Sequence, residues 1–127
     1  MAFPPEHRAF FEKDNLAAIS TLGDDGGPRV TMVWVDLDGD DILVNSTQRR
    51  NWPKNLERDP RVALCAFDKE VVVHNVAVIG HVLSMTTEGA WEHIQKLARK
   101  YGRDSYEGPT DRVMIRIAVD RSYLYQP

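Results

Sequence analysis

Hydrophobic and polar residues alternate along two stretches of the chain, and a period of two residues is the pattern of a half-buried β-strand. The first stretch is Arg29 to Leu37 and the second is Asp111 to Val119. In the first, one face would hold Val30, Met32 and Trp34, and the other Thr31, Val33 and Val35. Tyr123 to Tyr125 extends the second stretch or forms a short last strand.

Turn signals divide the first half of the chain. Gly and Asp residues cluster at 23–28 and again at 38–41, and such clusters mark hairpin turns. They separate a strand at 16–22, the strand at 29–37, and a third strand that begins at 42–44. The spacing predicts a three-stranded antiparallel meander, whose last strand leads into the polar segment from Asn45.

The longest apolar region is Val71 to Met85, and it follows a shorter strand from Val62 to Phe67. Its β-branched composition is that of a strand, but its length exceeds the usual three to ten residues. We therefore expect a bend or bulge, and Gly80 is the place for it.

Three helices are expected between these strands. The first covers Glu6 to Asp14, with Phe10 and Phe11 as buried anchors. The second covers Trp52 to Arg58, with Asn51 as its N-cap and Pro53 in its first turn. The third opens at Thr86-Thr87-Glu88 and ends at Gly102.

Six or seven antiparallel strands with three helices, and no alternation of strand and helix, define a mostly β fold with α elements. The pattern favours a small β-barrel with helical additions over a parallel sheet. The 127 residues correspond to a single domain, 1–127, by the usual size of domains.

Composition removes several classes of function. The net charge of −3 gives no support for nucleic-acid binding, and no apolar run is long enough to span a membrane. A cytoplasmic protein is expected. The single cysteine, Cys65, is interpreted as a buried small hydrophobe. The four histidines lack ligand spacing, so no metal site is expected.

The segment that joins the strand at 42–44 to the second helix is a candidate anion site. Ser46 and Thr47 supply hydroxyl groups, and the start of a helix supplies free N–H groups. Cations follow at Arg49, Arg50 and Lys54. The alternative is a solvated basic turn. Four aromatic residues could stack on a flat ring or could simply pack in the core: Trp34, Trp52, Tyr123 and Tyr125.

The order of these segments resembles one protein family. Its features are Gly26-Gly27-Pro28-Arg29-Val30, then Leu43-Val44-Asn45-Ser46-Thr47, then Asn55-Leu56-Glu57-Arg58-Asp59-Pro60-Arg61-Val62. Together they resemble the pyridoxamine 5′-phosphate oxidase-like split-barrel proteins, and in particular a short branch that uses FMN or the deazaflavin coenzyme F420. F420 is favoured over FMN because the chain is short and because of the overall pattern.

The resemblance implies a homodimeric split β-barrel with a cofactor at the dimer interface. The cofactor ring would lie along Val30, Thr31, Met32, Val33 and Trp34. The phosphate would be held by Asn45, Ser46 and Thr47 with Arg49, Arg50 and Lys54. The other subunit would cover the ring near His74 and Val78. The family commonly has a lysine where this chain has Trp52.

The resemblance therefore implies an oxidoreductase that transfers hydride to a small unsaturated organic substrate. No residue stands out as a catalytic proton donor. The missing lysine keeps a second hypothesis open, that the protein carries or stores a flavin or deazaflavin without turnover, or has lost cofactor binding. A third hypothesis, a structural dimer without a ligand, requires the basic turn to be mere surface.

Overall fold

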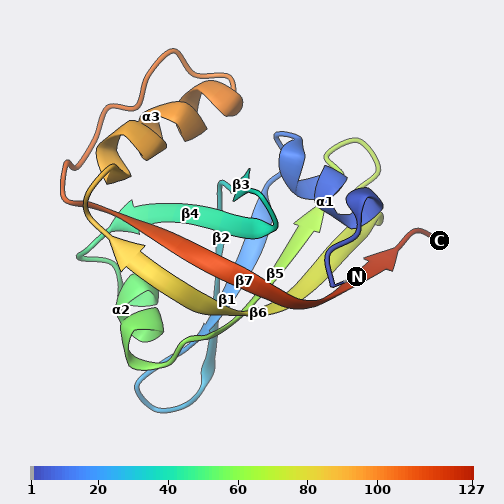
Figure 1. The fold of residues 1–127 in the computed structure, drawn as a ribbon, viewed down its shortest axis with the longest axis horizontal. Helices are drawn as coiled ribbons and strands as arrows, with labels where there is room; N and C mark the ends of the chain where they lie inside the picture. The colour runs from blue at the N-terminus through green and yellow to red at the C-terminus, as the bar shows by residue number, and fades with distance from the viewer. Residues whose placement is uncertain (1) are drawn as a thin grey trace.

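The computed structural model describes residues 2–127, which form three helices and seven strands (Figure 1). The helices are α1 (Pro5–Glu12), α2 (Asn51–Arg58) and α3 (Ala90–Lys100). The strands are β1 (Ala17–Leu22), β2 (Pro28–Val33), β3 (Asp36–Asp38), β4 (Asp41–Thr47), β5 (Arg61–Phe67), β6 (Asn75–Thr86) and β7 (Arg112–Tyr125). The predicted mostly β class with three helices is confirmed.

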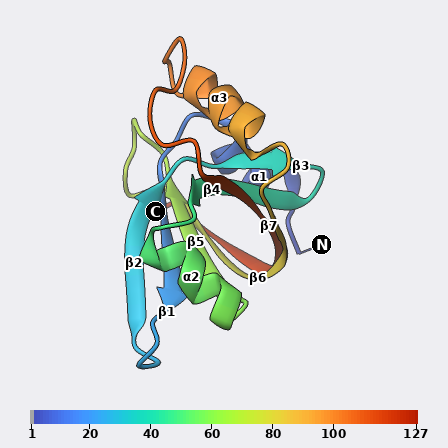
Figure 2. The same ribbon diagram turned by 90° about the vertical axis from the view of Figure 1, so that its left-hand side faces the viewer.

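All strands belong to one antiparallel sheet with the order β2-β1-β5-β6-β7-β4-β3. The two edge strands, β2 and β3, are consecutive in the chain and are separated by only Trp34 and Val35. So short a connection forces the sheet to curl until its two edges meet. The result is a barrel (Figure 2) whose seam between β2 and β3 carries no ladder, that is, a split barrel.

The strand pattern explains the core. On β4, Ile42 and Val44 point into the barrel and are fully buried, and Ser46 continues the same face. The matching inward residues of β7 are Val113, Ile115 and Ile117. The outward residues of β4, Leu43 and Asn45, are buried too, which requires a cover on the outside of the barrel.

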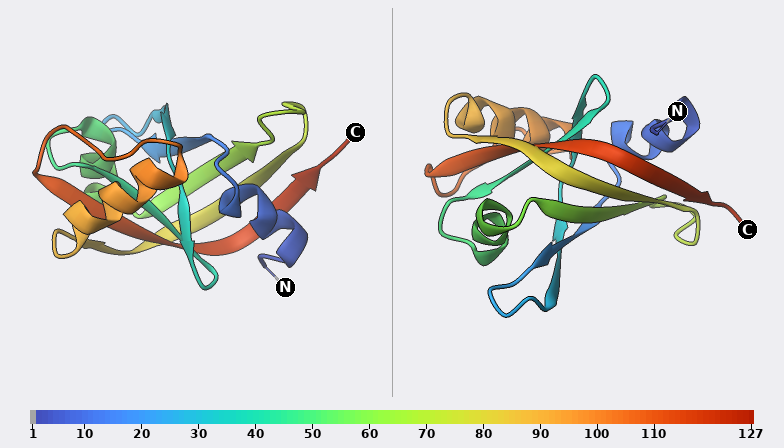
Figure 3. Two further views of the ribbon diagram at one scale, coloured as in Figure 1. Left: turned by 90° about the horizontal axis from the view of Figure 1, so that it is seen from above. Right: turned by 60° about the horizontal axis from the view of Figure 1, so that its bottom comes forward.

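The helices close the barrel and supply that cover (Figure 3). Helix α1 contributes Phe10 and Phe11 to the core, and α2 contributes Trp52 and Leu56. Helix α3 packs outside the barrel, on β4 and β7, with Ile94 and Leu97 buried against them. Its face over β4 is where the polar groups described below meet.

The bend expected in the long sixth strand is present. The pairing of β6 with β7 shifts register between Ile79 and Gly80, and again between Val82 and Ser84. A side chain at position 80 would collide with the backbone carbonyl oxygen of Ala118, so only glycine fits this crossing.

Several expected boundaries were wrong. The first three strands are not a meander, because β2 and β3 lie at opposite edges of the sheet order. The strand expected at 29–37 breaks at Trp34 and Val35, where the chain crosses the seam. Val71 to Val73 form an exposed turn before β6 rather than its first residues. Local alternation cannot distinguish one long strand from two strands that cross a seam.

The helix starts also differ from expectation. Arg50, not Asn51, occupies the N-cap position of α2, and no side chain caps it. Helix α3 begins at Ala90 after a left-handed Gly89, because β6 continues through Thr86. Cys65 is half-buried on the outer face of β5 rather than inside the barrel.

Candidate functional site

Two neighbouring clefts open beside the seam of the barrel. The first has a volume of about 580 Å³ and lies between the end of β2, the end of β4 and helix α3. Seven apolar residues and eight with polar groups line it: Leu16, Met32, Val33, Trp34, Ile94, Leu97 and Pro109, and then Asn45, Ser46, Thr47, Arg49, Arg50, Trp52, Tyr106 and Arg112.

The second cleft, of about 480 Å³, lies between β2 and α2. Its lining is more basic, and includes Arg29, Val30, Thr31, Lys54 and Arg58. Arg50 and Trp52 line both clefts, so the start of α2 is the wall between them. A ligand longer than either cleft could reach from one to the other past these two residues.

Eleven of the thirteen residues expected to contact a cofactor line one cleft or the other. The strand residues divide between them, with Val30 and Thr31 in the second cleft and Met32 to Trp34 in the first. The two others, His74 and Val78, line neither. The side chain of Val78 is fully buried in the core of its own chain, and the covering of a ring by this strand of a partner subunit stays a prediction.

The three expected cations differ in whether they form an ion pair within the chain. Arg49 forms a two-point ion pair with Asp111, with Nε and Nη2 at 3.0 and 3.1 Å from the carboxylate oxygens. This pair lowers the pKa of Asp111 and raises that of Arg49. Arg50 and Lys54 are exposed and form no ion pair with any residue in 2–127. They are the two cations available to an anion at the start of α2.

Trp52, which stands where the family commonly has lysine, is a core residue. It is 7% exposed and belongs to the main hydrophobic cluster. Its Nε1, like the hydroxyl of the 3% exposed Ser46, is buried without a hydrogen-bond partner. Buried donors without a partner among residues 2–127 are rare, and both of these residues line the first cleft.

A chain of polar contacts reaches the first cleft from beneath α3. The Asn45 amide donates to the carbonyl oxygen of Ala90 at 2.8 Å and contacts Nδ1 of His93 at 3.1 Å. Its oxygen accepts a bond of 2.9 Å from Nε of Arg112. The guanidinium of Arg112 continues to the hydroxyl of Tyr106, at 2.9 Å, and lies 4.7 Å from the centre of the same ring.

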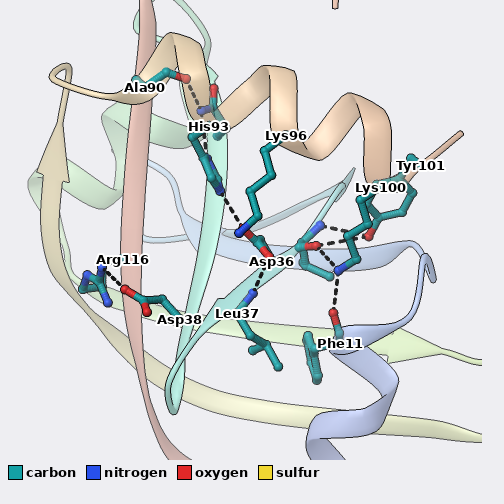
Figure 4. Close-up of polar contacts among 12 residues, drawn as sticks. Phe11, Asp36, Leu37, Asp38, Ala90, His93, Lys96, Lys100, Tyr101 and Arg116 are labelled. Carbon is teal, nitrogen blue, oxygen red and sulfur yellow. Dashed lines mark hydrogen bonds and ion pairs between the residues drawn. The ribbon is translucent and has the colours of Figure 1, made fainter. Parts of the chain in front are cut away.

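Arg112 fixes the direction of the hydrogen bonds in this series of contacts, because a guanidinium can only donate. The Asn45 oxygen must therefore face Arg112, and its NH₂ group must face His93. Nδ1 of His93 then accepts, and the neutral ring carries its proton on Nε2, which lies 3.3 Å from the Asp36 carboxylate (Figure 4). That last contact is electrostatic, since its geometry is not that of a hydrogen bond.

Asp36 anchors the far end of the chain. Its carboxylate accepts a bond from the backbone N–H of Leu37 at 2.9 Å and lies 3.1 Å from Nζ of Lys96. Burial raises the pKa of Asp36, but the contacts with His93 and Lys96 outweigh burial and hold the pKa well below its usual range. Asp36 is therefore an anion throughout the neutral range.

Two residues at the C-terminal end of α3, Lys100 and Tyr101, fix the backbone that crosses the seam. The Tyr101 hydroxyl donates to the carbonyl oxygen of Asn15 and accepts from the N–H of Val35. Lys100 donates to the carbonyl oxygens of Phe11 and Val35 (Figure 4). Burial raises the pKa of Tyr101 to about 12 and lowers that of Lys100. Trp34 stacks on Tyr101 with ring centres 5.2 Å apart.

Sequence reasoning did not select Arg112, His93 or Asp36. The available signal was a polar residue within an apolar stripe: His93 lies three residues after Ala90 and four before Leu97 on α3. Within residues 2–127, no three His, Cys, Asp or Glu side chains converge as metal ligands. No described helix combines the length and apolar character needed to cross a membrane.

The fold is a split barrel with two clefts beside its seam, and comparison with known proteins identifies the family. The chain belongs to the pyridoxamine 5′-phosphate oxidase family, whose model matches residues 3–126. No curated protein matches the chain in sequence.

Similar solved structures share this fold. An F420 reductase superimposes with a TM-score of 0.85 at 24% identity, covering 94% of this chain and 98% of that one. A conserved hypothetical protein from Mycobacterium tuberculosis has a TM-score of 0.77 at 21% identity and covers 94% and 82%. The HupZ protein of Group A Streptococcus has a TM-score of 0.73 at 22% identity and covers 97% and 94%.

Proposed function

We propose that the protein is an oxidoreductase that binds a phosphate-bearing flavin or deazaflavin cofactor, F420 rather than FMN, at the interface of a homodimer, and reduces a small unsaturated organic molecule. The observation that carries the proposal is the double cleft at the start of α2, where Arg50 and Lys54 are unpaired and Ser46 lacks a partner. Family membership and the similarity to an F420 reductase support it.

The residues present fit the phosphate end of such a cofactor. Helix α2 begins without a side-chain cap, so the first N–H groups after Arg50 are free to meet an anion. Thr47 adds a hydroxyl at the end of β4, and Arg50 adds a guanidinium that suits two parallel bonds to phosphate. Arg49 is already engaged by Asp111, so its part would be weaker.

The edge strand β2 fits the ring. β2 pairs only with β1, so the N–H and C=O groups of its other edge are unpaired and can meet the polar rim of a flat heterocycle. The bound cofactor would supply the hydride chemistry, and the protein would orient the ring and exclude water. Trp34 is less suited to stack on the ring, because Tyr101 and the Arg103 guanidinium lie against its own ring.

A second copy of the chain has a surface to cover. The register places small and apolar residues in one continuous outer face across five strands, from Val30 and Met32 through Ala18, Cys65 and Ala77 to Tyr123. Val30 is 71% exposed and Tyr123 53% exposed, which is unusual for side chains of this kind. This face adjoins β2, so a partner seated on it would also close the second cleft.

A titration tests the proposed function. The purified protein is mixed with FMN and separately with F420, and binding is followed by cofactor fluorescence. A reductant and a panel of enones are then added. We expect F420 to bind more tightly than FMN and to reduce one or more enones. Binding of neither cofactor would overturn the proposal. Binding without turnover would favour a second candidate, a flavin or deazaflavin carrier, to which the buried Trp52 at the lysine position points.

A further inference from the structure

Arg112 is a buried cation without a carboxylate partner. The residue is only 7% exposed, and both hydrogen bonds of its side chain go to neutral groups, the Asn45 amide and the Tyr106 hydroxyl. The adjacent Asp111 is bound on both oxygens by Arg49. Among residues 2–127, no Asp or Glu forms an ion pair with Arg112. A buried charge in this state is unfavourable unless something else compensates it.

The surroundings hold this cation in place instead of neutralising it. Asn45 is fixed by Ala90 and His93, and His93 is backed by the Asp36 carboxylate. On the other side, Tyr106 is pinned by two bonds between its backbone and the side chain of Gln95, of 2.9 and 3.1 Å. The guanidinium of Arg112 is therefore held in one orientation while its charge is not neutralised, as is typical of a side chain that binds a ligand.

The first cleft shows what would reach Arg112. Its lining combines the apolar side chains of Met32, Ile94 and Leu97 with the guanidinium of Arg112. The second cleft already offers Arg50 and Lys54 to a phosphate. A molecule with a flat apolar body and one anionic end matches the first cleft. The planar fork of arginine matches a carboxylate in particular.

We infer that Arg112 is the binding group for the carboxylate of the reactant, and that Asn45, His93 and Asp36 are positioning residues that aim it into the first cleft. The identity of this ligand as the reactant rests on the proposed function, whereas the carboxylate subsite itself does not. The reactants expected are unsaturated organic acids with a planar apolar body.

Cinnamate and its neutral analogue cinnamamide test this without any cofactor, because they share a body and differ in charge. Binding to the full chain is measured by calorimetry, and the Nε–H of Arg112 is followed by ¹⁵N NMR. We expect cinnamate to bind about tenfold or more tightly than cinnamamide, as a charge-assisted bond would give. We also expect cinnamate alone to shift the Arg112 resonance. Equal binding, or an unmoved resonance, would overturn the inference.

Variants locate the effect. Arg112→Gln should remove the preference for cinnamate, whereas Arg99→Gln, which removes an exposed charge from α3, should keep it. Asn45→Asp is the sharper change, because it supplies an internal carboxylate to Arg112. It should abolish the preference while leaving Arg112 in place. If the preference for cinnamate survives Asn45→Asp, Arg112 does not bind the carboxylate through its unbalanced charge. If a variant does not fold, the shift of the Arg112 resonance in the wild type still tests the inference.

A second experiment distinguishes the two anions that Arg112 could bind, the carboxylate of the reactant and the phosphate of the cofactor. If Arg112 serves the reactant, the dissociation constants of FMN and F420 should change less than about threefold in Arg112→Gln. A loss of cofactor affinity equal to the loss of cinnamate affinity would assign Arg112 to the cofactor phosphate and overturn the inference. If neither cofactor binds but the cinnamate preference holds, the proposed function fails and the carboxylate subsite stands.

Discussion

The two clefts are built on opposite principles, although they share the wall formed by Arg50 and Trp52. In the first, the polar groups are buried and held by one another in the chain Asp36–His93–Asn45–Arg112. In the second, the cations at Arg50 and Lys54 stand in solvent. Buried groups fix geometry and so choose among ligands, whereas exposed charges attract any anion and are weakened by salt.

The stability of the protein and its affinity for anions should therefore respond to different substitutions. Changes in the wall and the buried chain should cost folding free energy. Changes among the exposed cations should cost binding and leave the fold unchanged.

The largest effect is expected at the shared wall. Trp52→Lys restores the residue type that the family commonly has, but here it replaces a core side chain with a charge. We expect it to lower the free energy of unfolding by about 3–5 kcal/mol, as loss of a buried aromatic does. Urea denaturation measures this. Trp91→Lys, at a position 38% exposed, is the matched control and should cost about 1 kcal/mol or less. A stable Trp52→Lys variant that binds cofactor more tightly would contradict the division.

Asp36→Asn tests the buried chain next. It removes the charge that faces His93 and Lys96, and we expect a loss of about 2–3 kcal/mol in the free energy of unfolding at pH 7. The folded-state pKa of Asp36 lies below its unfolded value, so this stability is present above about pH 3.9 and is lost as the pH falls further.

Urea titrations of both chains across pH 2–7 give the check. The difference between wild type and Asp36→Asn should be constant at neutral pH and should shrink below about pH 3.9. Asp38→Asn is the control, because Asp38 forms an exposed pair with Arg116 rather than a buried contact. A difference that grows toward acid would show that Asp36 is not stabilised as an anion.

The division between the clefts also explains what sequence alone could predict. The exposed half of the site is local: Thr47, Arg50 and Lys54 lie within eight residues of one another, and a strand followed by a basic turn and a helix indicates an anion site by itself. The barrel class followed in the same way from strand periods and turns. Each of these signals is contained in a window of about ten residues.

The buried half could not be found in this way, because it joins residues from distant parts of the chain. Asn45 and Arg112 are 67 positions apart, and Asn45 and His93 are 48 apart. Their meeting depends on β4 pairing with β7 and on α3 crossing outside β4, neither of which is a local property. The error in the meander has the same origin, since the seam at Trp34 and Val35 is visible only in the complete sheet order.

Among the exposed cations, Arg50→Ala should have the greater effect on binding. If Arg50 holds the phosphate by charge-assisted bonds, its loss weakens the cofactor by about 1.5–3 kcal/mol of binding free energy. Fluorescence titration measures this, and the midpoint of urea unfolding should not move. Arg61→Ala is the control, because Arg61 is paired with Asp59, which lowers the pKa of that carboxyl to about 2. Unchanged affinity in Arg50→Ala would place the phosphate elsewhere.

Lys54→Ala should have the smallest effect on cofactor binding. An exposed lysine acts as a flexible point charge, so we expect a loss of about 0.5–1 kcal/mol of binding free energy that disappears as salt is raised from 20 to about 500 mM. Lys13→Ala removes an exposed charge outside both clefts and should change nothing. A loss as large as that in Arg50→Ala, or a loss that persists at high salt, would show that Lys54 is not an exposed and screened charge in the complex.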